Sequence, residues 1–279
     1  MLAFKRLTLL SLPNDINIIF IIYFNQTLKI SIITVCYNSA ATIADTLRSV
    51  RFQTYKNIEH IIIDGGSKDN TLEVVTAEGQ HVVKLISEKD KGIYDAMNKG
   101  IELASGDVIG FINADDFYPN QAVLDTVAAA FEASGADCCF GDLCYVQQDD
   151  ISRFVRYWKS SAFEPGLFEK GWCPPHPTFF VRRSVYQRLG GFNLGYKIAA
   201  DVELMARFLA LGRTTNHYVP DVLVHMRMGG TTNRNLVNIV KQNLEIRRGL
   251  LANGLRFSWP KFVFYKVLSR AAQFVLRPA

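Results

Sequence analysis

The sequence has no apolar run long enough to cross a bilayer as a helix, which takes roughly 20 residues. The apolar stretch near the N-terminus, residues 16–24, is short and is broken by Asn17. A secretory leader is not indicated either, because Asn, Gln and Thr at 25–27 make a poor cleavage site. We therefore expect residues 1–28 to be an extension outside the folded core.

Cysteine is scarce and shows no pattern of a disulfide framework or a metal site. The five cysteines are odd in number and contain no C-x-x-C spacing. Free thiols in a reducing compartment are the simplest interpretation, and a zinc site is not expected. The five are Cys36, Cys138, Cys139, Cys144 and Cys173.

A large excess of one charge is also missing, since the net charge is only +5 over 279 residues. This balance gives no reason to expect a nucleic-acid partner. The excess is uneven, because eight basic residues from Lys241 onward are opposed by one acid, Glu245. Apolar side chains alternate with these cations between Trp259 and Leu276, which predicts an amphipathic helix on a membrane surface. The same apolar stripe would equally suit packing against the folded core.

Strand and helix patterns alternate over residues 29–140. β-branched runs predict the strands, and apolar residues three or four apart predict the helices. Such alternation is typical of an α/β fold with a mostly parallel sheet flanked by helices. We expect strands at 29–35, 58–63, 82–86, 108–112 and 136–140, and helices near 43–50, 71–78, 93–101 and 119–134.

Polar side chains gather where these strands end. Clusters follow four of the strands, at 34–38, 64–69, 88–95 and 113–116. Because ligands of open parallel sheets bind at the carboxyl ends of the strands, these clusters predict a binding site there.

The strongest local signal is the acid pair Asp115 and Asp116, which follows a buried strand. Two adjacent carboxylates repel each other unless a cation joins them, and oxygen ligands suit Mg²⁺ or Mn²⁺ bound with a diphosphate. Acids in the first turn of a helix are the competing interpretation, since the helix dipole favours them there.

Six segments in order together resemble the family 2 glycosyltransferases, which invert the sugar configuration and have a GT-A fold. The resemblance covers roughly residues 29–232, and the order and spacing of the segments are more specific than any one of them. The segments are 30–38, 61–71, 87–100, 111–116, 176–180 and 198–204. The resemblance implies a Rossmann-like GT-A sheet and a sugar-nucleotide donor, here expected to be UDP-linked.

The resemblance also implies donor contacts for individual residues. Thr34 and Tyr37 would line the pocket of the nucleotide base, and Asp64 would accept a hydrogen bond from the base. Lys91 and Asn98 lie in the segment that contacts donor phosphates or sugar in the family.

Three residues of the acidic motif take different roles under the resemblance. Asp115 would be the main metal ligand, for Mg²⁺ or Mn²⁺. Asn113 stands where the family usually has an Asp, and an amide there can bind ribose but is a poorer metal ligand. This departure makes the neighbouring Asp116 the second candidate ligand.

On the acceptor side, the resemblance makes Asp201 the catalytic base. Inversion needs one carboxylate that deprotonates the acceptor hydroxyl as it attacks the anomeric carbon. A structural helix cap is the competing interpretation of Asp201. His176 and His225 are candidate contacts to phosphate or acceptor, and each would equally suit a structural role.

Other enzyme classes fit the sequence less well. A dehydrogenase needs G-x-G-x-x-G after the first strand, and residues 37–41 contain no glycine. A nucleotidyltransferase also uses acids and Mg²⁺, but commonly has a glycine-rich basic first loop that this chain lacks. A non-catalytic nucleotide-sugar-binding module stays open as an alternative.

We therefore predict a glycosyltransferase domain at 29–235, with a nucleotide-sugar-binding half at 29–140 and an acceptor half at 141–235. Residues 236–279 are expected to form a basic amphipathic helical tail. The predicted acceptor is a glycan or lipid-linked sugar in polysaccharide biosynthesis. The predicted location is cytoplasmic, on the inner face of the membrane, without nucleic acid as a partner.

Overall fold

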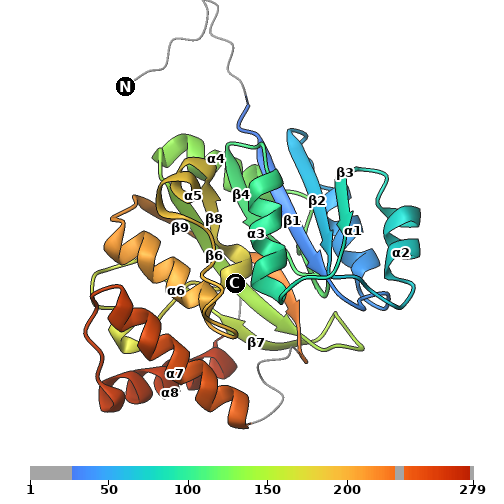
Figure 1. Ribbon diagram of the computed structural model, residues 1–279. Coiled ribbons are helices and arrows are strands. Elements are labelled where there is room, and N and C mark those ends of the chain that lie inside the picture. Colours follow the sequence, from blue (N-terminus) through green and yellow to red (C-terminus); the bar gives the residue numbers. More distant parts are fainter. Residues whose placement is uncertain (1–26, 230–235, 277–279) are drawn as a thin grey trace, which may run out of the picture.

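The first half of the chain forms a parallel sheet, as the alternating pattern predicts (Figure 1). The structure is a computed structural model that describes residues 27–229 and 236–276. Most of the predicted extension therefore lies outside the described residues. The four strands are β1 (Ile30–Cys36), β2 (Ile58–Asp64), β3 (Val82–Ser87) and β4 (Val108–Phe111).

Five further strands complete one nine-stranded sheet of mixed direction, in the order β3-β2-β1-β4-β8-β6-β9-β5, with β7 beside β6. β8 runs antiparallel to β4 and β6, whereas β9 runs parallel to β6. The α/β prediction is confirmed, and the antiparallel pairings are an addition to it. These strands are β5 (Asp116–Phe117), β6 (Cys138–Val146), β7 (Phe154–Trp158), β8 (Phe180–Arg182) and β9 (Asn216–Arg227).

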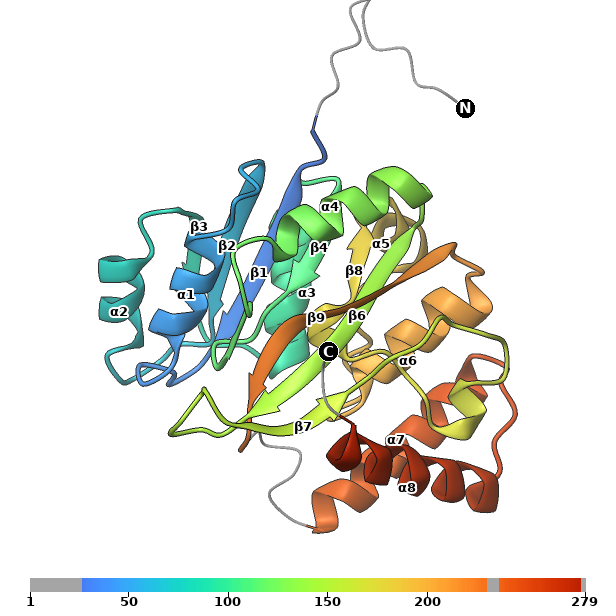
Figure 2. The ribbon, with the colours of Figure 1, turned by 180° about the vertical axis from the view of Figure 1, so that it is seen from behind.

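Helices cover both faces of the sheet (Figures 1 and 2). α3 (Ile93–Leu103), α5 (Arg183–Leu189) and α6 (Ala200–Ala206) bury their apolar residues in one core. α1 (Ile43–Arg51), α2 (Thr71–Glu78) and α4 (Val123–Ser134) pack on the opposite face. The acidic motif therefore does not open a helix: it leads into β5, and α4 begins only at Val123.

The C-terminal region is part of the folded body. It forms two helices, α7 (Leu236–Ala252) and α8 (Trp259–Val275), within the range where the sequence pattern predicts a helical tail. Ile246, Leu250 and Phe262 are buried in the same core as α3 and α6. α7 and α8 therefore pack against the residues that precede them, and residue 140 lies inside β6.

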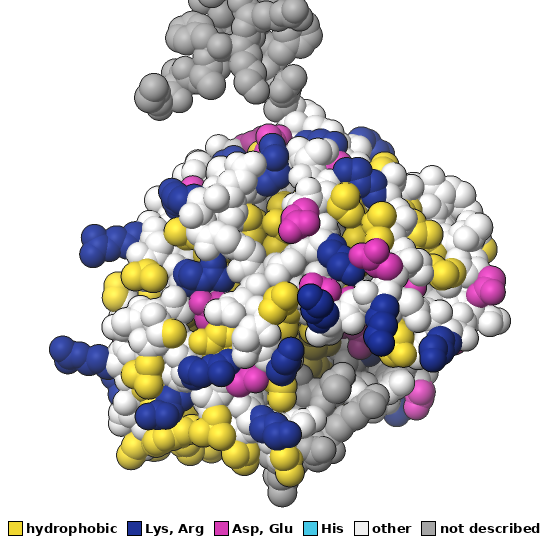
Figure 3. All heavy atoms as spheres, viewed as in Figure 1, with side chains coloured by type: hydrophobic (Ala, Val, Ile, Leu, Met, Phe, Trp, Pro, Cys, Tyr) yellow, Lys and Arg dark blue, Asp and Glu magenta, His cyan; other side chains and the backbone are white. Residues whose placement is uncertain are grey.

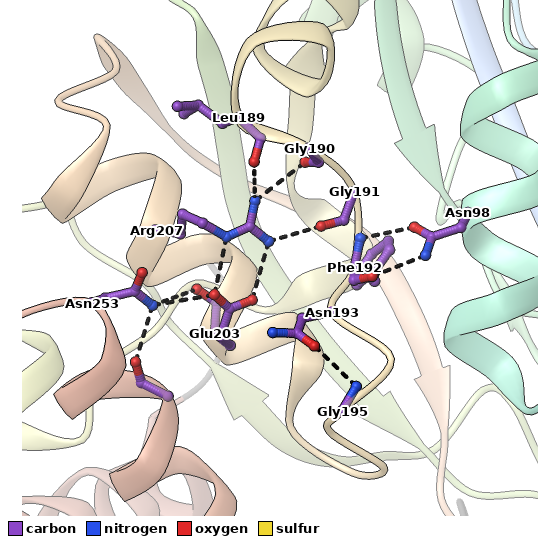
Figure 4. A network of polar contacts seen from close by, with 11 residues as sticks. Asn98, Leu189, Gly190, Gly191, Phe192, Asn193, Gly195, Glu203, Arg207 and Asn253 are labelled. Carbon is purple, nitrogen blue, oxygen red and sulfur yellow. Dashed lines mark hydrogen bonds and ion pairs between the residues drawn. The ribbon is translucent and has the colours of Figure 1, made fainter.

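A buried polar network joins α6, α7 and the loop after α5 (Figure 4). Arg207, just after α6, forms an ion pair with Glu203 at 3.0 Å and donates to the Gly191 carbonyl at 2.8 Å. Asn253, just after α7, donates to Glu203 Oε1 at 3.3 Å. These bonds fix α6, and with it the residues at its N-terminal end.

Candidate active site

The acidic motif is held in a turn between β4 and β5. The Asp116 amide donates to the Asn113 carbonyl at 3.1 Å, and Thr46 of α1 donates to the Asp116 carbonyl at 2.6 Å. Arg227, the last residue of β9, donates to the Asp115 carbonyl at 2.8 Å and forms an ion pair with Asp45. The backbone of the motif is therefore anchored from α1 and β9.

The two acids of the motif differ in burial. Asp116 is fully buried, whereas Asp115 keeps part of its surface exposed. Asn113 Nδ2 donates to Asp116 Oδ2 at 3.1 Å, but the Oδ1 atoms of both side chains lack hydrogen-bond partners among the described residues. Two buried oxygens thus remain available for a further donor or a cation.

Burial raises the pKa of Asp115, and burial together with the charge of Asp115 raises the pKa of Asp116 well above its ordinary value. The charge of Arg227 opposes both shifts in part. A divalent cation would relieve the repulsion between the two carboxylates.

The donor set fits such a cation when a diphosphate supplies further ligands. Within residues 27–229 and 236–276, no three His, Cys, Asp or Glu side chains gather as a metal site. The chain offers one or two carboxylates and an amide oxygen, which is the pattern of Mg²⁺ sites completed by substrate phosphates.

Asp64 lies at the end of β2 and organises the loop that follows. Its carboxylate accepts from the Gly66 and Ser67 amides at 3.1 and 3.0 Å, and from the hydroxyls of Ser67 and Ser87, the latter at 2.6 Å. Burial acts to raise its pKa, but these hydrogen bonds outweigh burial and lower it. Asp64 is therefore a buried carboxylate held by internal donors, and its contact with a base stays a prediction.

Tyr37, Gly65 and Asp90 lie together above this loop. The Tyr37 ring is 57 % exposed and would be 3.5 Å from a Cβ added at Gly65, which would also collide with the Asp90 carboxylate. A side chain at residue 65 would therefore require the Asp90 carboxylate to move. Lys91 follows on the same segment with an exposed side chain, while its amide donates to Asp95 at 3.0 Å.

Two of the predicted donor contacts have internal partners instead. Thr34 is fully buried, and its hydroxyl lies 2.9 Å from His60 Nε2, so its side chain does not reach the surface beside Tyr37. Asn98 pairs with the backbone of Phe192 through both halves of its amide, at 2.9 and 2.8 Å (Figure 4). Its observed task is to join α3 to the loop before α6.

Asp201 lies in the first turn of α6, where the helix dipole favours a carboxylate. The Tyr94 hydroxyl of α3 lies 2.9 Å from the Ile198 carbonyl and 3.2 Å from Asp201 Oδ1. The His176 ring is tilted against Phe111 and lies edge-on to Phe192, with ring centroids 5.5 Å apart in each case. Burial lowers the pKa of His176, although the nearby charge of Asp201 opposes this shift. A neutral imidazole therefore lies beside the candidate base.

Glu245 of α7 is a site residue that the sequence analysis did not identify. Its carboxylate accepts from the amides of Lys197, Ile198 and Ala199, at 2.8 to 3.0 Å. These amides precede α6, so Glu245 caps the helix that carries Asp201. Its isolation as the only acid in a basic region was a signal, but its partner could not be known without the fold.

His225 of β9 lies away from Asp201, between the rings of Phe117 and Phe154 at 5.4 and 5.2 Å. Burial lowers its pKa to about 4. The structure therefore places His225 among aromatic residues near the acidic motif, whereas His176 lies near Asp201.

The comparisons with known proteins agree with this arrangement. Residues 31–190 match the family model described as "Glycosyl transferase family 2". The PGL/p-HBAD biosynthesis glycosyltransferase of Mycobacterium bovis (strain BCG / Pasteur 1173P2) is 30% identical over 251 residues, which cover 86% of this chain and 93% of that protein. The two sequences therefore correspond over almost their whole lengths.

Two solved structures share the fold at low sequence identity. S. aureus TarS 1-349, in complex with UDP-GlcNAc, superposes with a TM-score of 0.63 and 17% identity, covering 89% of this chain and 72% of TarS. The mannosyltransferase PcManGT from Pyrobaculum calidifontis, in complex with GDP-Man and Mn²⁺, gives 0.56 and 18%, covering 91% and 82%.

Proposed function

The chain belongs to family 2 of the glycosyltransferases and is a glycosyltransferase, and from this premise we propose a specific reaction. The enzyme transfers a sugar from a UDP-linked donor to a hydroxyl of a glycan or lipid-linked acceptor, with inversion at the anomeric carbon. The observation that carries the proposal is Asp201, held by Tyr94 and by the Glu245-capped start of α6.

The donor is proposed to lie across the carboxyl ends of the parallel strands. Tyr37 offers an exposed ring for stacking on a base, and Asp64 and Lys91 flank the same loops. The fold neighbours bound to UDP-GlcNAc and GDP-Man support a nucleotide sugar as the donor. We propose UDP because the family resemblance assigns the Asp64 carboxylate to the imide N–H of uracil.

Asp115 is proposed to hold Mg²⁺ or Mn²⁺ together with the donor diphosphate, with Asp116 and Asn113 behind it. A bound cation of this kind stabilises the charge that develops on a departing diphosphate. The Mn²⁺ present in the PcManGT complex supports a divalent metal here. Arg227 fixes the backbone of Asp115 and so keeps its carboxylate at the donor.

Asp201 is proposed to take the proton of the acceptor hydroxyl. As that oxygen bonds to the anomeric carbon, the bond to the nucleoside diphosphate breaks on the opposite face, which inverts the configuration. A hydrogen bond from Tyr94 orients the carboxylate for this transfer. The neutral His176 adds no competing charge next to it.

A membrane-facing surface formed by α7 and α8 is proposed to bring the enzyme to a lipid-linked acceptor. Apolar side chains gather over these helices with Lys and Arg between them (Figure 3). Phe264 and Val267 are 60 % and 61 % exposed. No helix of residues 27–229 and 236–276 could itself span a bilayer. We therefore propose that α7 and α8 contact the cytoplasmic surface of the membrane without spanning it.

The decisive experiment incubates the purified full chain with a panel of UDP- and GDP-sugars and a crude lipid extract, with and without Mn²⁺. We expect nucleoside diphosphate to be released from one UDP-sugar, and the product to show inverted anomeric configuration by NMR. Asp201→Asn should lower kcat by about 10²–10⁴-fold with donor Kd nearly unchanged. Loss of donor affinity with normal turnover would move Asp201 into the donor site.

The same assay, extended with a nucleoside triphosphate and a sugar phosphate, also separates the alternative functions. Release of pyrophosphate from a nucleoside triphosphate and a sugar phosphate would indicate a nucleotidyltransferase. Tight binding of a nucleotide sugar without turnover in any lipid or glycan extract would indicate a binding module.

A further inference from the structure

Three cations converge from β7 and α8 next to the candidate active site. Arg156 of β7 lies between the rings of Tyr145 and Phe274, at 3.8 and 5.9 Å from their centroids. The charge of Arg270 contributes to the pKa shifts of Arg156, Tyr145 and Lys266. Lys266 lies one turn before Arg270 in α8.

None of these cations, Arg156, Lys266 and Arg270, forms an ion pair with an acid of the described residues. Arg156 is only 6 % exposed, and its Nε has no hydrogen-bond partner within the same residues. Burial and the charge of Arg270 lower the pKa of Lys266 to about 8. Arg156 is buried, Lys266 is partly buried and Arg270 is exposed beside them. Like charges so close together are costly when no anion balances them, so this arrangement lacks an anion.

The cations of α8 lie near Asp201. The charge of Asp201 contributes to the pKa shifts of Lys266 and Cys173. The charges of Lys266 and Arg270 also contribute to the pKa shift of Cys173. Lys266 is turned into the body, where it donates to Asn243 of α7 at 2.6 Å. It therefore does not serve the exposed surface of α8.

The sheet register separates these cations from the acidic motif. Asp116, Met226, Tyr145 and Arg156 are direct partners across β5, β9, β6 and β7, so their side chains share one face. Three strand spacings of about 4.8 Å place Arg156 roughly 14 Å from Asp116. One phosphate group cannot contact both ends of this row.

We propose that Arg156, Lys266 and Arg270 form an anion subsite for a phosphate group of the acceptor, distinct from the donor diphosphate. The acceptor is then a phosphate- or diphosphate-linked sugar, whose phosphate binds at α8 while its hydroxyl reaches Asp201. This inference rests on the proposed transfer reaction for its meaning, but the subsite can be measured without turnover.

The test titrates inorganic phosphate and pyrophosphate into the full chain by calorimetry at low ionic strength, before and after saturation with UDP and Mn²⁺. We expect both anions to bind in either state. Arg270→Gln, an exposed position that leaves the core intact, should weaken phosphate binding about tenfold, as should Lys266→Met. Both variants should keep the UDP Kd within about twofold. Lys261→Gln, another exposed cation of α8, is the matched control and should change neither Kd.

Competition between phosphate and UDP would assign the anion to the donor diphosphate and overturn the acceptor subsite. Equal phosphate affinity in Arg270→Gln, Lys266→Met and the unaltered chain would overturn it as well, and so would the absence of phosphate binding. Failure of the donor proposal has a different signature, because UDP would then not bind while phosphate binding could still be scored.

Discussion

At the scale of single residues, the neighbouring acids Asp115 and Asp116 differ in burial and therefore in what they can contact. Asp115 is partly exposed and can reach a ligand, whereas Asp116 is enclosed and pairs with Asn113. The sequence analysis ranked Asp115 before Asp116 as a ligand through the resemblance, but it could not foresee the difference in burial. Only the antiparallel pairing of β5 with β9 turns Asp116 inward.

Substitution of the two acids should therefore have unequal effects. Asp115→Ala should abolish transfer and greatly weaken donor binding in Mn²⁺, because it removes the exposed ligand. Asp116→Asn keeps the shape and the contact to Asn113, so we expect a smaller loss. Initial rates and donor Kd with Mn²⁺ and in EDTA measure both effects, and full activity in saturating EDTA would contradict the metal role.

At the scale of elements, a buried polar chain links β1, β2 and the start of β3. His60 lies 2.9 Å from both Thr34 Oγ1 and His81 Nε2. Burial lowers the pKa of His60 to about 3, with the charge of His81 adding to the shift, and burial also lowers the pKa of His81. Both rings are therefore neutral in the folded protein near neutral pH.

This chain should make the fold sensitive to acid. The unfolded state takes up a proton at His60 below its ordinary pKa of 6.5, whereas the folded state resists until about 3. As the pH is lowered through this window, the free energy of unfolding should therefore decrease. The decrease should be about 1.4 kcal/mol per pH unit for each proton that only the unfolded state binds.

Urea denaturation between pH 7 and 5 measures the slope, which should be shallower in His60→Gln. The exposed His217 supplies the matched control, and His217→Gln should keep the slope of the unaltered chain. Equal slopes in all three proteins would show that His60 is not the responsible group.

Between elements, one side chain of α7 fixes the start of α6. Removing the Glu245 carboxylate leaves the amides of residues 197–199 without their acceptor. We expect Glu245→Ala to lower the free energy of unfolding by about 1–3 kcal/mol. Its kcat should also fall, since Asp201 loses its support, while donor Kd should change little. Glu132→Ala, an exposed acid of α4, is the control, and similar losses in both variants would refute the capping role.

Elements formed by contacts between residues close in sequence could be predicted, whereas features that depend on residues far apart in sequence could not. The helix at Thr71–Glu78 was predicted to the residue, because its signals are local. β9 was missed because Pro220 and Asp221 interrupt its pattern, and register shifts interrupt its pairing with β6. The capping by Glu245 and the inward turn of Lys266 depend on helices far apart in sequence, which no local pattern encodes.

At the scale of the whole molecule, α7 and α8 carry a surface with many exposed apolar side chains. The predicted tail helix is present, but only part of its charge faces outward, since Lys266 points into the body and Arg277 lies outside the described residues. Deleting α8 would also remove Phe262 from the core, so a truncation cannot isolate membrane contact.

Point substitutions on the exposed surface are the sharper test. Phe264→Glu with Val267→Glu should abolish co-sedimentation with anionic vesicles at low salt, because both side chains would meet the apolar interior. UDP binding by this variant should be unchanged. Val83→Glu, an exposed apolar position on β3 at the far edge of the sheet, is the control. If the double variant binds vesicles like the control, another surface makes the contact.

The position of β9 between β6 and β5 has a consequence for synthesis on the ribosome. β5 carries Asp116, yet its strand partner is made about a hundred residues later, at Met226 and His225. Arg227, which anchors the Asp115 carbonyl, emerges at the same time. A nascent chain that has completed β1 to β4 therefore holds the loops that follow β1 and β2 but not the acidic motif. The order of translation therefore leaves the acidic motif without its anchor until β9 has been made.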